Sequence, residues 1–167
     1  VNMNSNRLIT GCKKYQKPFE KYLFPLILFL YPFIGVRQGV DVTDTTYSLG
    51  NYQFQNSLDK VWMLATYLPN LLGHGLTLLP GGDSMLGMNV YTTFLICIMA
   101  LGVYYLLQRW MPGWMLFAGE MIAISLCWCP RVILYNYMTY LFLTFGTIML
   151  LYALTTQKRN VLYFVLA

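Results

Sequence analysis

Apolar residues gather into five runs along the chain, and one long polar interval separates the first run from the others. The runs cover residues 22–36, 90–107, 114–128, 132–154 and 161–167. About 20 apolar residues are needed to cross the ~30 Å hydrocarbon core of a bilayer. The pattern therefore predicts an all-α, polytopic helical membrane protein with about five transmembrane helices. The last of these is cut short at Ala167, so we expect the chain to be an N-terminal fragment.

The amino-acid composition is typical of a membrane protein. Of the 167 residues, 57% are hydrophobic and only 10% are charged, whereas soluble domains carry about 25% charged residues. The formal net charge is +5, but the basic residues stand at the ends of apolar runs rather than in a stripe with interleaved aromatics. This distribution argues against nucleic acid as a partner and indicates the lipid bilayer instead.

The domain organisation follows from the same pattern. Residues 1–21 form a basic tail, which we place in the cytoplasm, and residues 22–167 form a single membrane domain. Within it, the polar interval 37–89 is expected to be a large outside loop that carries interfacial helices. This interval contains all four aspartates and the only histidine.

Two helices are predicted inside the polar interval. Asp44 is a good N-cap for a helix whose first turn is Thr45-Thr46-Tyr47. Ser57 or Asp59 is a candidate cap for a second helix, because apolar residues recur near helical spacing from Leu58 to Leu72.

Breaking residues delimit the second helix. Pro69 and the triplet Gly73-His74-Gly75 are expected to interrupt it, and Pro80-Gly81-Gly82-Asp83 is a turn signal. Either Val61–Leu79 spans the membrane or it lies flat in the interface.

Charge favours the flat arrangement of Val61–Leu79. If this segment lies flat, eight basic residues are cytoplasmic and three are outside, whereas a spanning segment changes the count to six and five. Cytoplasmic loops of membrane proteins carry the excess of lysine and arginine, so we expect the flat arrangement.

Two aspartates close to the end of the first run are the candidate catalytic residues. Asp41 and Asp44 are three residues apart and would share a face of a helical turn. A carboxylate at the membrane surface serves as a general base or as a metal ligand. The alternative is structural: Asp44 caps a helix and Asp41 is solvated.

The segment Asp44-Thr45-Thr46-Tyr47-Ser48-Leu49-Gly50-Asn51-Tyr52, with Trp62 and Thr66 further on, resembles the GT-C superfamily of polytopic membrane glycosyltransferases. It is similar to uncharacterised bacterial members with the pattern Asp-x-x-Tyr-x-x-x-Asn. The resemblance implies transfer of a sugar from a polyprenyl-phosphate donor to an acceptor (a lipid, a glycan or a protein) at the outer face of a bacterial plasma membrane. It makes Asp44 the counterpart of the family aspartate and Asn51 a substrate-binding residue.

The chain departs from the family pattern in its acids. Many members carry an adjacent acidic pair where this chain has Asp44-Thr45, and a second acid in the outside loop that is here Cys129-Pro130-Arg131. The family leaves room for a divalent metal, but no metal ligand is assigned. Arg37 and Arg131 are instead candidates to offset the charge of the lipid phosphate; alternatively, Arg131 only anchors its helix at the headgroups.

Two further side chains of the polar interval are candidate substrate contacts. Tyr47 is suited to stack on a sugar ring, and His74 to contact substrate or phosphate. The alternative for His74 is a polar anchor at headgroup level.

Glu120 stands inside the run 114–128, where an acid costs roughly 2.5 kcal/mol or more. Either it is functional, or it is neutral and hydrogen-bonded to a neighbouring helix. A functional intramembrane acid supports the alternative function, a transporter or flippase.

Overall fold

The computed structural model describes residues 17–37, 42–57, 61, 66–126, 135–156 and 160–167. All regular structure in these ranges is helical, so the all-α prediction is confirmed for them. The elements are η1 (Phe19–Leu23), α2 (Phe24–Leu30), η2 (Tyr31–Gly35), α3 (Val42–Gln53), η3 (Gln55–Ser57), α5 (Tyr67–Thr77), α6 (Met85–Leu107), α7 (Gly113–Leu126), α8 (Tyr135–Thr155) and α9 (Asn160–Leu166).

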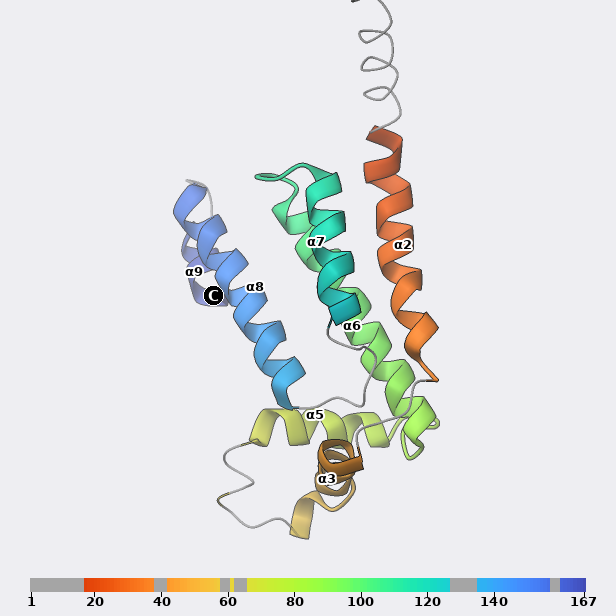
Figure 1. The fold of residues 1–167 in the computed structure, drawn as a ribbon. Coiled ribbons are helices and arrows are strands. Elements are labelled where there is room, and N and C mark those ends of the chain that lie inside the picture. The colour runs from red at the N-terminus through yellow and green to blue at the C-terminus, as the bar shows by residue number, and fades with distance from the viewer. Residues whose placement is uncertain (1–16, 38–41, 58–60, 62–65, 127–134, 157–159) are drawn as a thin grey trace, which may run out of the picture.

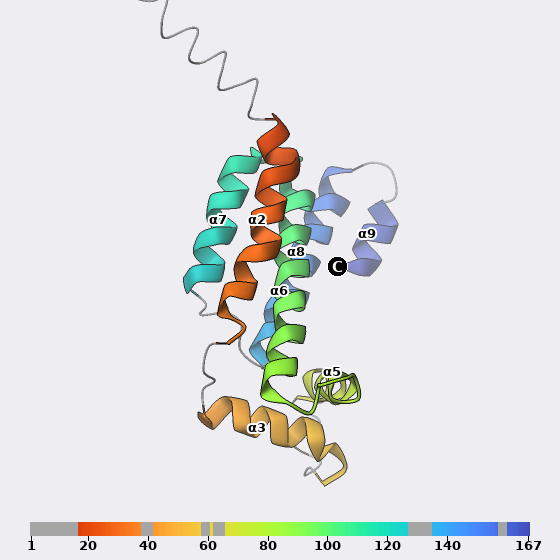
Figure 2. The same cartoon turned by 90° about the vertical axis from the view of Figure 1, so that its right-hand side faces the viewer.

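The helices form a bundle that is covered at one end. Figure 1 shows α2, α6, α7 and α8 running along one another, with α3 and α5 lying across the end where α6 begins. Figure 1 shows α5 lengthwise and α3 end-on, and Figure 2 shows the reverse, so the two short helices also cross each other. We call α3 and α5 the crosswise pair, and the end of the bundle that they cover the crosswise end. The opposite end, where the first helical run begins with Lys17 and Lys21 and where Arg109 follows α6, is the basic end.

The first helical run changes its winding at its two prolines. A π-helical turn, η1, precedes α2, which has Pro25 in its first turn, and the 3-10 helix η2 has Pro32 in its first turn. A proline lacks the backbone N–H and clashes with the carbonyl four residues before it. The run therefore stays helical from Phe19 to Gly35 as three differently wound pieces.

The prediction of five spans is confirmed only in part. Among the described residues, two helices are long and apolar enough to cross a membrane, Met85–Leu107 and Asn136–Thr155. Helix α7 has 14 residues, or ~21 Å at 1.5 Å per residue, which is less than the thickness of a hydrocarbon core. The first run is divided into three short helices, and α9 has 7 residues.

Helix α6 begins five residues before the predicted start at 90, because Ser84 caps it. The Ser84 hydroxyl accepts a hydrogen bond from the Gly87 N–H at 3.1 Å. The predicted turn at Pro80–Asp83 is confirmed, and Gly81 adopts φ 74°, which favours glycine. Gly87 packs against the Gly81 carbonyl, where a Cβ atom would not fit.

The predictions for the polar interval need two corrections. Asp44 is not an N-cap, because α3 already begins at Val42 and holds Asp44 in its first turn. Ser57 is the last residue of η3, and residues 58–60, Asp59 among them, lie outside the described residues, so the predicted cap of a second helix at Ser57 or Asp59 stays a prediction. Helix α5 continues through Gly73-His74-Gly75, and Pro69 lies in its first turn, where a proline is tolerated.

The main hydrophobic core lies between α2, α6 and α7. Its buried members are Leu28, Ile96, Ala100, Tyr104, Leu116 and Ile124. The rings of Phe24 and Phe117 stack at its edge with centroids 4.4 Å apart. A smaller cluster of Tyr52 and Met88 joins α3 to the beginning of α6.

Large apolar side chains also cover the outside of the bundle. Exposed examples include Phe94 and Ile98 on α6, Ile122 on α7, and Leu143 and Leu154 on α8. Helices α6 and α8 contain no charged residue. The long helices therefore present hydrocarbon both to one another and to their surroundings.

Candidate functional site

A row of polar residues follows one side of α3, starting at the candidate base. Asp44, Ser48 and Asn51 are four and three residues apart, a spacing that places them along one face of a helix. Asp44 is exposed, whereas Ser48 and Asn51 are 5% and 7% exposed. The row thus leads from the surface into the interior of the crosswise end.

The two helices of the crosswise pair are joined at Tyr52. Its backbone carbonyl oxygen lies 2.8 Å from Nδ1 of His74, which must carry the proton because a carbonyl only accepts. Gly73 lies against the Tyr52 ring, since a Cβ atom there would be 2.4 Å from two ring carbons. His74 and Gly73 therefore connect α5 to α3.

Burial changes the acidity of Tyr52. The side chain is 1% exposed, and desolvation raises the pKa of its phenol to about 12, against a smaller opposing effect of a hydrogen bond with Ser48. The phenol is therefore neutral near pH 7 and does not act as a base there.

A buried polar layer underlies the crosswise end. Asn89 donates from Nδ2 to the Val36 carbonyl at 3.2 Å, which ties the start of α6 to the end of the first helical run. Thr92 and Thr93 donate to the carbonyls one turn earlier. The buried polar residues in the described ranges are Thr45, Ser48, Asn51, Asn70, Asn89, Thr92 and Thr93.

Two atoms of this layer have no hydrogen-bond partner among the described residues, Thr45 Oγ1 and Asn89 Oδ1. A buried polar atom without a partner usually costs ~1–3 kcal/mol of lost solvation, so these two atoms lower the stability of the crosswise end. Sequence reasoning overlooked Thr45, Asn89 and the Thr92-Thr93 pair as parts of one layer. For Asn89, Thr92 and Thr93 the available signal was the series of polar residues near the start of the otherwise apolar helix α6, whereas Thr45 lies on α3 and had no such signal.

The remaining predicted site residues are distributed over three places. Tyr47 is 48% exposed on α3, and Arg37 is exposed just after η2. Glu120 is half-buried midway along α7, a helix of the bundle, and is not part of the crosswise pair. Asp41 and Arg131 lie outside the described residues.

The structure thus brings Asp44, Tyr47 and Asn51 onto one helix and attaches His74 to it through Tyr52. Nδ1 of His74 is engaged with protein backbone, which leaves Nε2 as its atom for any ligand. Within the described ranges, no group of three or more His, Cys, Asp or Glu residues is arranged to hold a metal ion.

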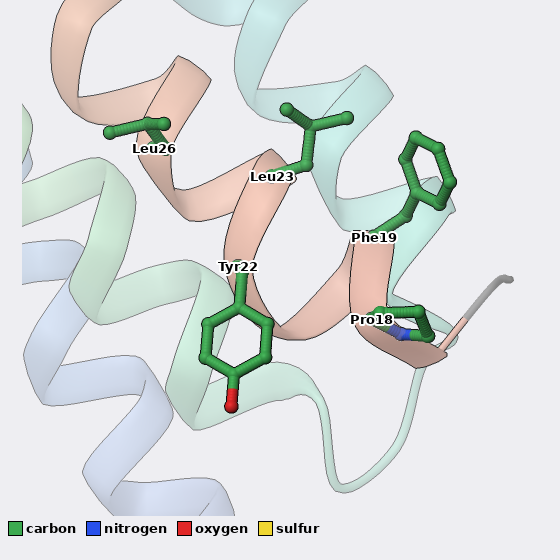
Figure 3. Close-up of a pocket in the computed structure, with 5 residues that line it drawn as sticks. All are labelled: Pro18, Phe19, Tyr22, Leu23 and Leu26. Carbon is green, nitrogen blue, oxygen red and sulfur yellow. The ribbon is translucent and has the colours of Figure 1, made fainter.

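A separate apolar groove lies on the outer surface of the first helical run. It has a volume of about 360 Å³ and is lined by Pro18, Phe19, Tyr22, Leu23 and Leu26. Figure 3 shows these side chains projecting from one continuous helical segment. Apart from the Tyr22 phenol the lining is apolar, so we assign it no chemistry.

Comparison with protein-family models, curated proteins and solved structures finds no match for this chain. The described part of the fold defines its class as a helical protein with two helices long and apolar enough to cross a membrane. The resemblance to GT-C glycosyltransferases stays a prediction.

Proposed function

We propose that the chain is an integral membrane protein that transfers a sugar at the outer face of the membrane. The observation that carries the membrane part is the outer surface of the bundle. Exposed leucines, isoleucines and phenylalanines cover α6, α7 and α8, and neither α6 nor α8 contains a charge. Only an apolar surrounding medium or a large partner stabilises such a surface, and the lengths of α6 and α8 suit a bilayer.

The side chains of α5 support a position in the membrane interface. Leu68, Leu71 and Leu72 are 42–54% exposed, whereas Asn70 and Gly73 are buried. A helix at a water-exposed surface places its polar side outward, and α5 does the opposite. Its leucine side therefore suits the acyl boundary of the outer leaflet, with α5 lying across the bundle as Figure 1 shows.

The charges at the two ends support the orientation. Lys17 and Lys21 begin the first helical run, and Arg109 lies in the turn after α6, all at the basic end. Asp44 and Asp83 lie at the crosswise end. The positive-inside rule then places the basic end in the cytoplasm and the crosswise end outside, as expected for an enzyme that uses a lipid-linked donor there.

Asp44 is the proposed general base. Its exposed carboxylate, on the first turn of α3, takes the proton from an acceptor hydroxyl. The acceptor oxygen forms a bond to the anomeric carbon while the bond from that carbon to the phosphate oxygen breaks. The polyprenyl phosphate leaves with the electron pair, and Arg37, exposed just after η2, offsets its charge.

The first test compares two aspartates at the same end of the bundle. Membrane vesicles that contain the protein are supplied with radiolabelled polyprenyl-phosphate hexoses, and transfer to extractable lipid, glycan and protein is counted. Asp44→Asn should lower transfer at least 100-fold, since general-base catalysis contributes about 10²–10⁴-fold. Asp83→Asn, in the exposed turn, should leave transfer unchanged. Full activity of Asp44→Asn would remove Asp44 from the mechanism.

The same vesicles distinguish sugar transfer from the alternative function, which is transport through a site at Glu120. No hydrogen bond or ion pair involves the Glu120 carboxylate within the described part of the chain, although it lies on an otherwise uncharged helix. For a transporter, Glu120→Gln should abolish movement of substrate across the vesicle membrane, and Asp44→Asn should have no effect. Loss of transfer in Asp44→Asn with retained transfer in Glu120→Gln contradicts the transporter.

A further inference from the structure

The basic end contains a cluster that positions one arginine. Arg109, in the turn between α6 and α7, donates from Nη1 to the Thr156 hydroxyl at 3.0 Å. Its guanidinium carbon lies 5.8 Å from the ring centroids of both Trp110 and Tyr152. The two rings meet edge-to-face with centroids 4.6 Å apart. The guanidinium is therefore oriented by the ends of two different helices.

Tyr152 fixes this arrangement to the bundle. Its hydroxyl donates to the Leu106 carbonyl at 2.7 Å, and its ring also contacts Tyr163 of α9 with centroids 5.6 Å apart. Helices α6, α8 and α9 thus all contribute to the position of the ring on which the guanidinium rests.

Among the described residues, no carboxylate neutralises the charge of Arg109. Arg109 is exposed, and no ion pair involves it within the described part of the chain. The Glu20 carboxylate, which is at the same end, accepts from the Trp114 N–H instead. Lys17 and Lys21 are also at this end, and Lys158 and Arg159 follow Thr156 closely in the sequence. The basic end therefore offers positive charge with one preorganised guanidinium.

We propose that Arg109, Trp110, Tyr152 and Thr156 form a binding site for the phosphate of an anionic phospholipid headgroup. A guanidinium has five N–H donors in a planar fork that matches phosphate oxygens, and the bond to Thr156 uses one of them. Tryptophan and tyrosine are the side chains that favour headgroup depth in a bilayer. The site rests on the membrane part of the proposed function and is independent of sugar transfer.

Arg109 has a simpler possible role, which is to offset the negative ends of two helices, and this role predicts a different result from lipid binding. The turn follows the C-terminus of α6, and Thr156 follows α8, so the guanidinium also lies near two negative helix ends. If Arg109 only offsets these dipoles, its replacement should lower stability equally in every lipid. A lipid site instead predicts a loss that depends on the anionic headgroup.

The experiment titrates phosphatidylglycerol with brominated acyl chains into the purified protein in phosphatidylcholine nanodiscs and follows quenching of tryptophan fluorescence. Wild type should show saturable quenching. Arg109→Gln should weaken the apparent affinity more than tenfold, because it removes charge-assisted hydrogen bonds to the phosphate in addition to the general attraction of one positive charge. Arg109→Lys, which keeps the charge and loses the fork, should fall between the two. Lys21→Gln is the matched control, because it removes one charge at the same end outside the cluster and should weaken the affinity by no more than about fivefold, the effect of general attraction alone.

Several outcomes overturn the proposal. Equal weakening by Lys21→Gln shows diffuse attraction, and unchanged affinity in Arg109→Gln shows that Arg109 only caps helices. Displacement of phosphatidylglycerol by millimolar inorganic phosphate shows a site for free phosphate. Carbonate extraction of membranes tests insertion separately: a protein released by carbonate refutes the membrane proposal itself, whereas a retained protein without headgroup preference refutes only this site.

Discussion

Tyr52 has three separate contacts at the centre of the crosswise pair. Its carbonyl accepts from His74, its ring lies beneath Gly73, and its side chain packs with Met88 of α6. One residue therefore connects α3 to α5 and both of them to the bundle. Changes at Tyr52 and at the atoms around it should affect the whole crosswise end.

Gly73 tests the contact with the Tyr52 ring. In Gly73→Ala the new methyl group would meet ring carbons at 2.4 Å, and this ring is buried. Overpacking of this kind costs about 1–3 kcal/mol in the free energy of unfolding. Thermal unfolding in detergent should show the loss.

The control lies two residues further along the same helix. At Gly75 nothing lies within 4 Å of the added methyl group, so Gly75→Ala should be neutral or should stabilise α5 by up to ~1 kcal/mol through helix propensity. Equal effects of the two substitutions would contradict the close contact between Gly73 and Tyr52.

The phenol of Tyr52 should make stability depend on alkaline pH. Burial raises its pKa from 10.0 to about 12, so the folded state favours the protonated phenol. This contribution is complete below pH 10 and is lost as pH rises from 10 to 12, because the unfolded chain releases the proton more readily. The loss is on the order of 3 kcal/mol, because one pKa unit corresponds to about 1.4 kcal/mol. Unfolding temperatures at pH 9–12 should therefore fall less steeply for Tyr52→Phe than for wild type, with Tyr47→Phe on the exposed side of α3 as the control.

Among the elements, η1, α6 and α7 meet at Glu20. Its backbone carbonyl accepts from the Tyr104 hydroxyl at 2.6 Å, and its carboxylate oxygen Oε1 accepts from the Trp114 N–H at 3.3 Å. A carboxylate at the start of α7 satisfies a backbone donor and complements the positive end of the helix. Glu20 therefore caps a helix that begins 93 positions later in the chain, at Gly113.

Substitutions at Glu20 should separate the hydrogen bond from the charge. Glu20→Ala removes both and should cost about 1 kcal/mol of stability. Glu20→Gln keeps an oxygen acceptor and should cost only a few tenths, the part due to the helix dipole. Differential scanning calorimetry in detergent measures both. A loss in Glu20→Gln as large as that in Glu20→Ala would assign the whole effect to charge.

Periodicity and hydropathy predicted the elements that local sequence determines. The turns at 80–83 and after 107 are present, and α6 and α8 fall on predicted runs. Helices α3 and α6 begin three and five residues before their predicted starts, and α6 does so because Ser84 caps it ahead of the apolar run. The continuous α5 was also missed, because Gly73 is there for contact with Tyr52 and not as a helix breaker.

In the whole molecule, the two ends have different chemistry although the helices between them are nearly uniform hydrocarbon. The crosswise end combines acids with a buried polar layer, and the basic end combines cations with aromatic rings. The sequence could predict Asp44, Tyr47 and Asn51 as one group, because they are close along the chain. It could not predict that Asn89, 38 positions after Asn51, belongs to the same polar end, because that depends on the packing of α6 against the first helical run.

The difference between the ends makes orientation directly testable. In a variant without native cysteines, a cysteine is placed at Ser57, exposed at the end of η3, or at Met111, exposed in the turn at the basic end. A membrane-impermeant maleimide should label Ser57→Cys in intact cells and Met111→Cys only after permeabilisation, because the cations at the basic end favour the cytoplasm. The reverse pattern would place Asp44 in the cytoplasm and away from an outer-face donor. Labelling of both sites in intact cells would contradict a membrane between the two ends and, with it, every function that needs them in separate compartments.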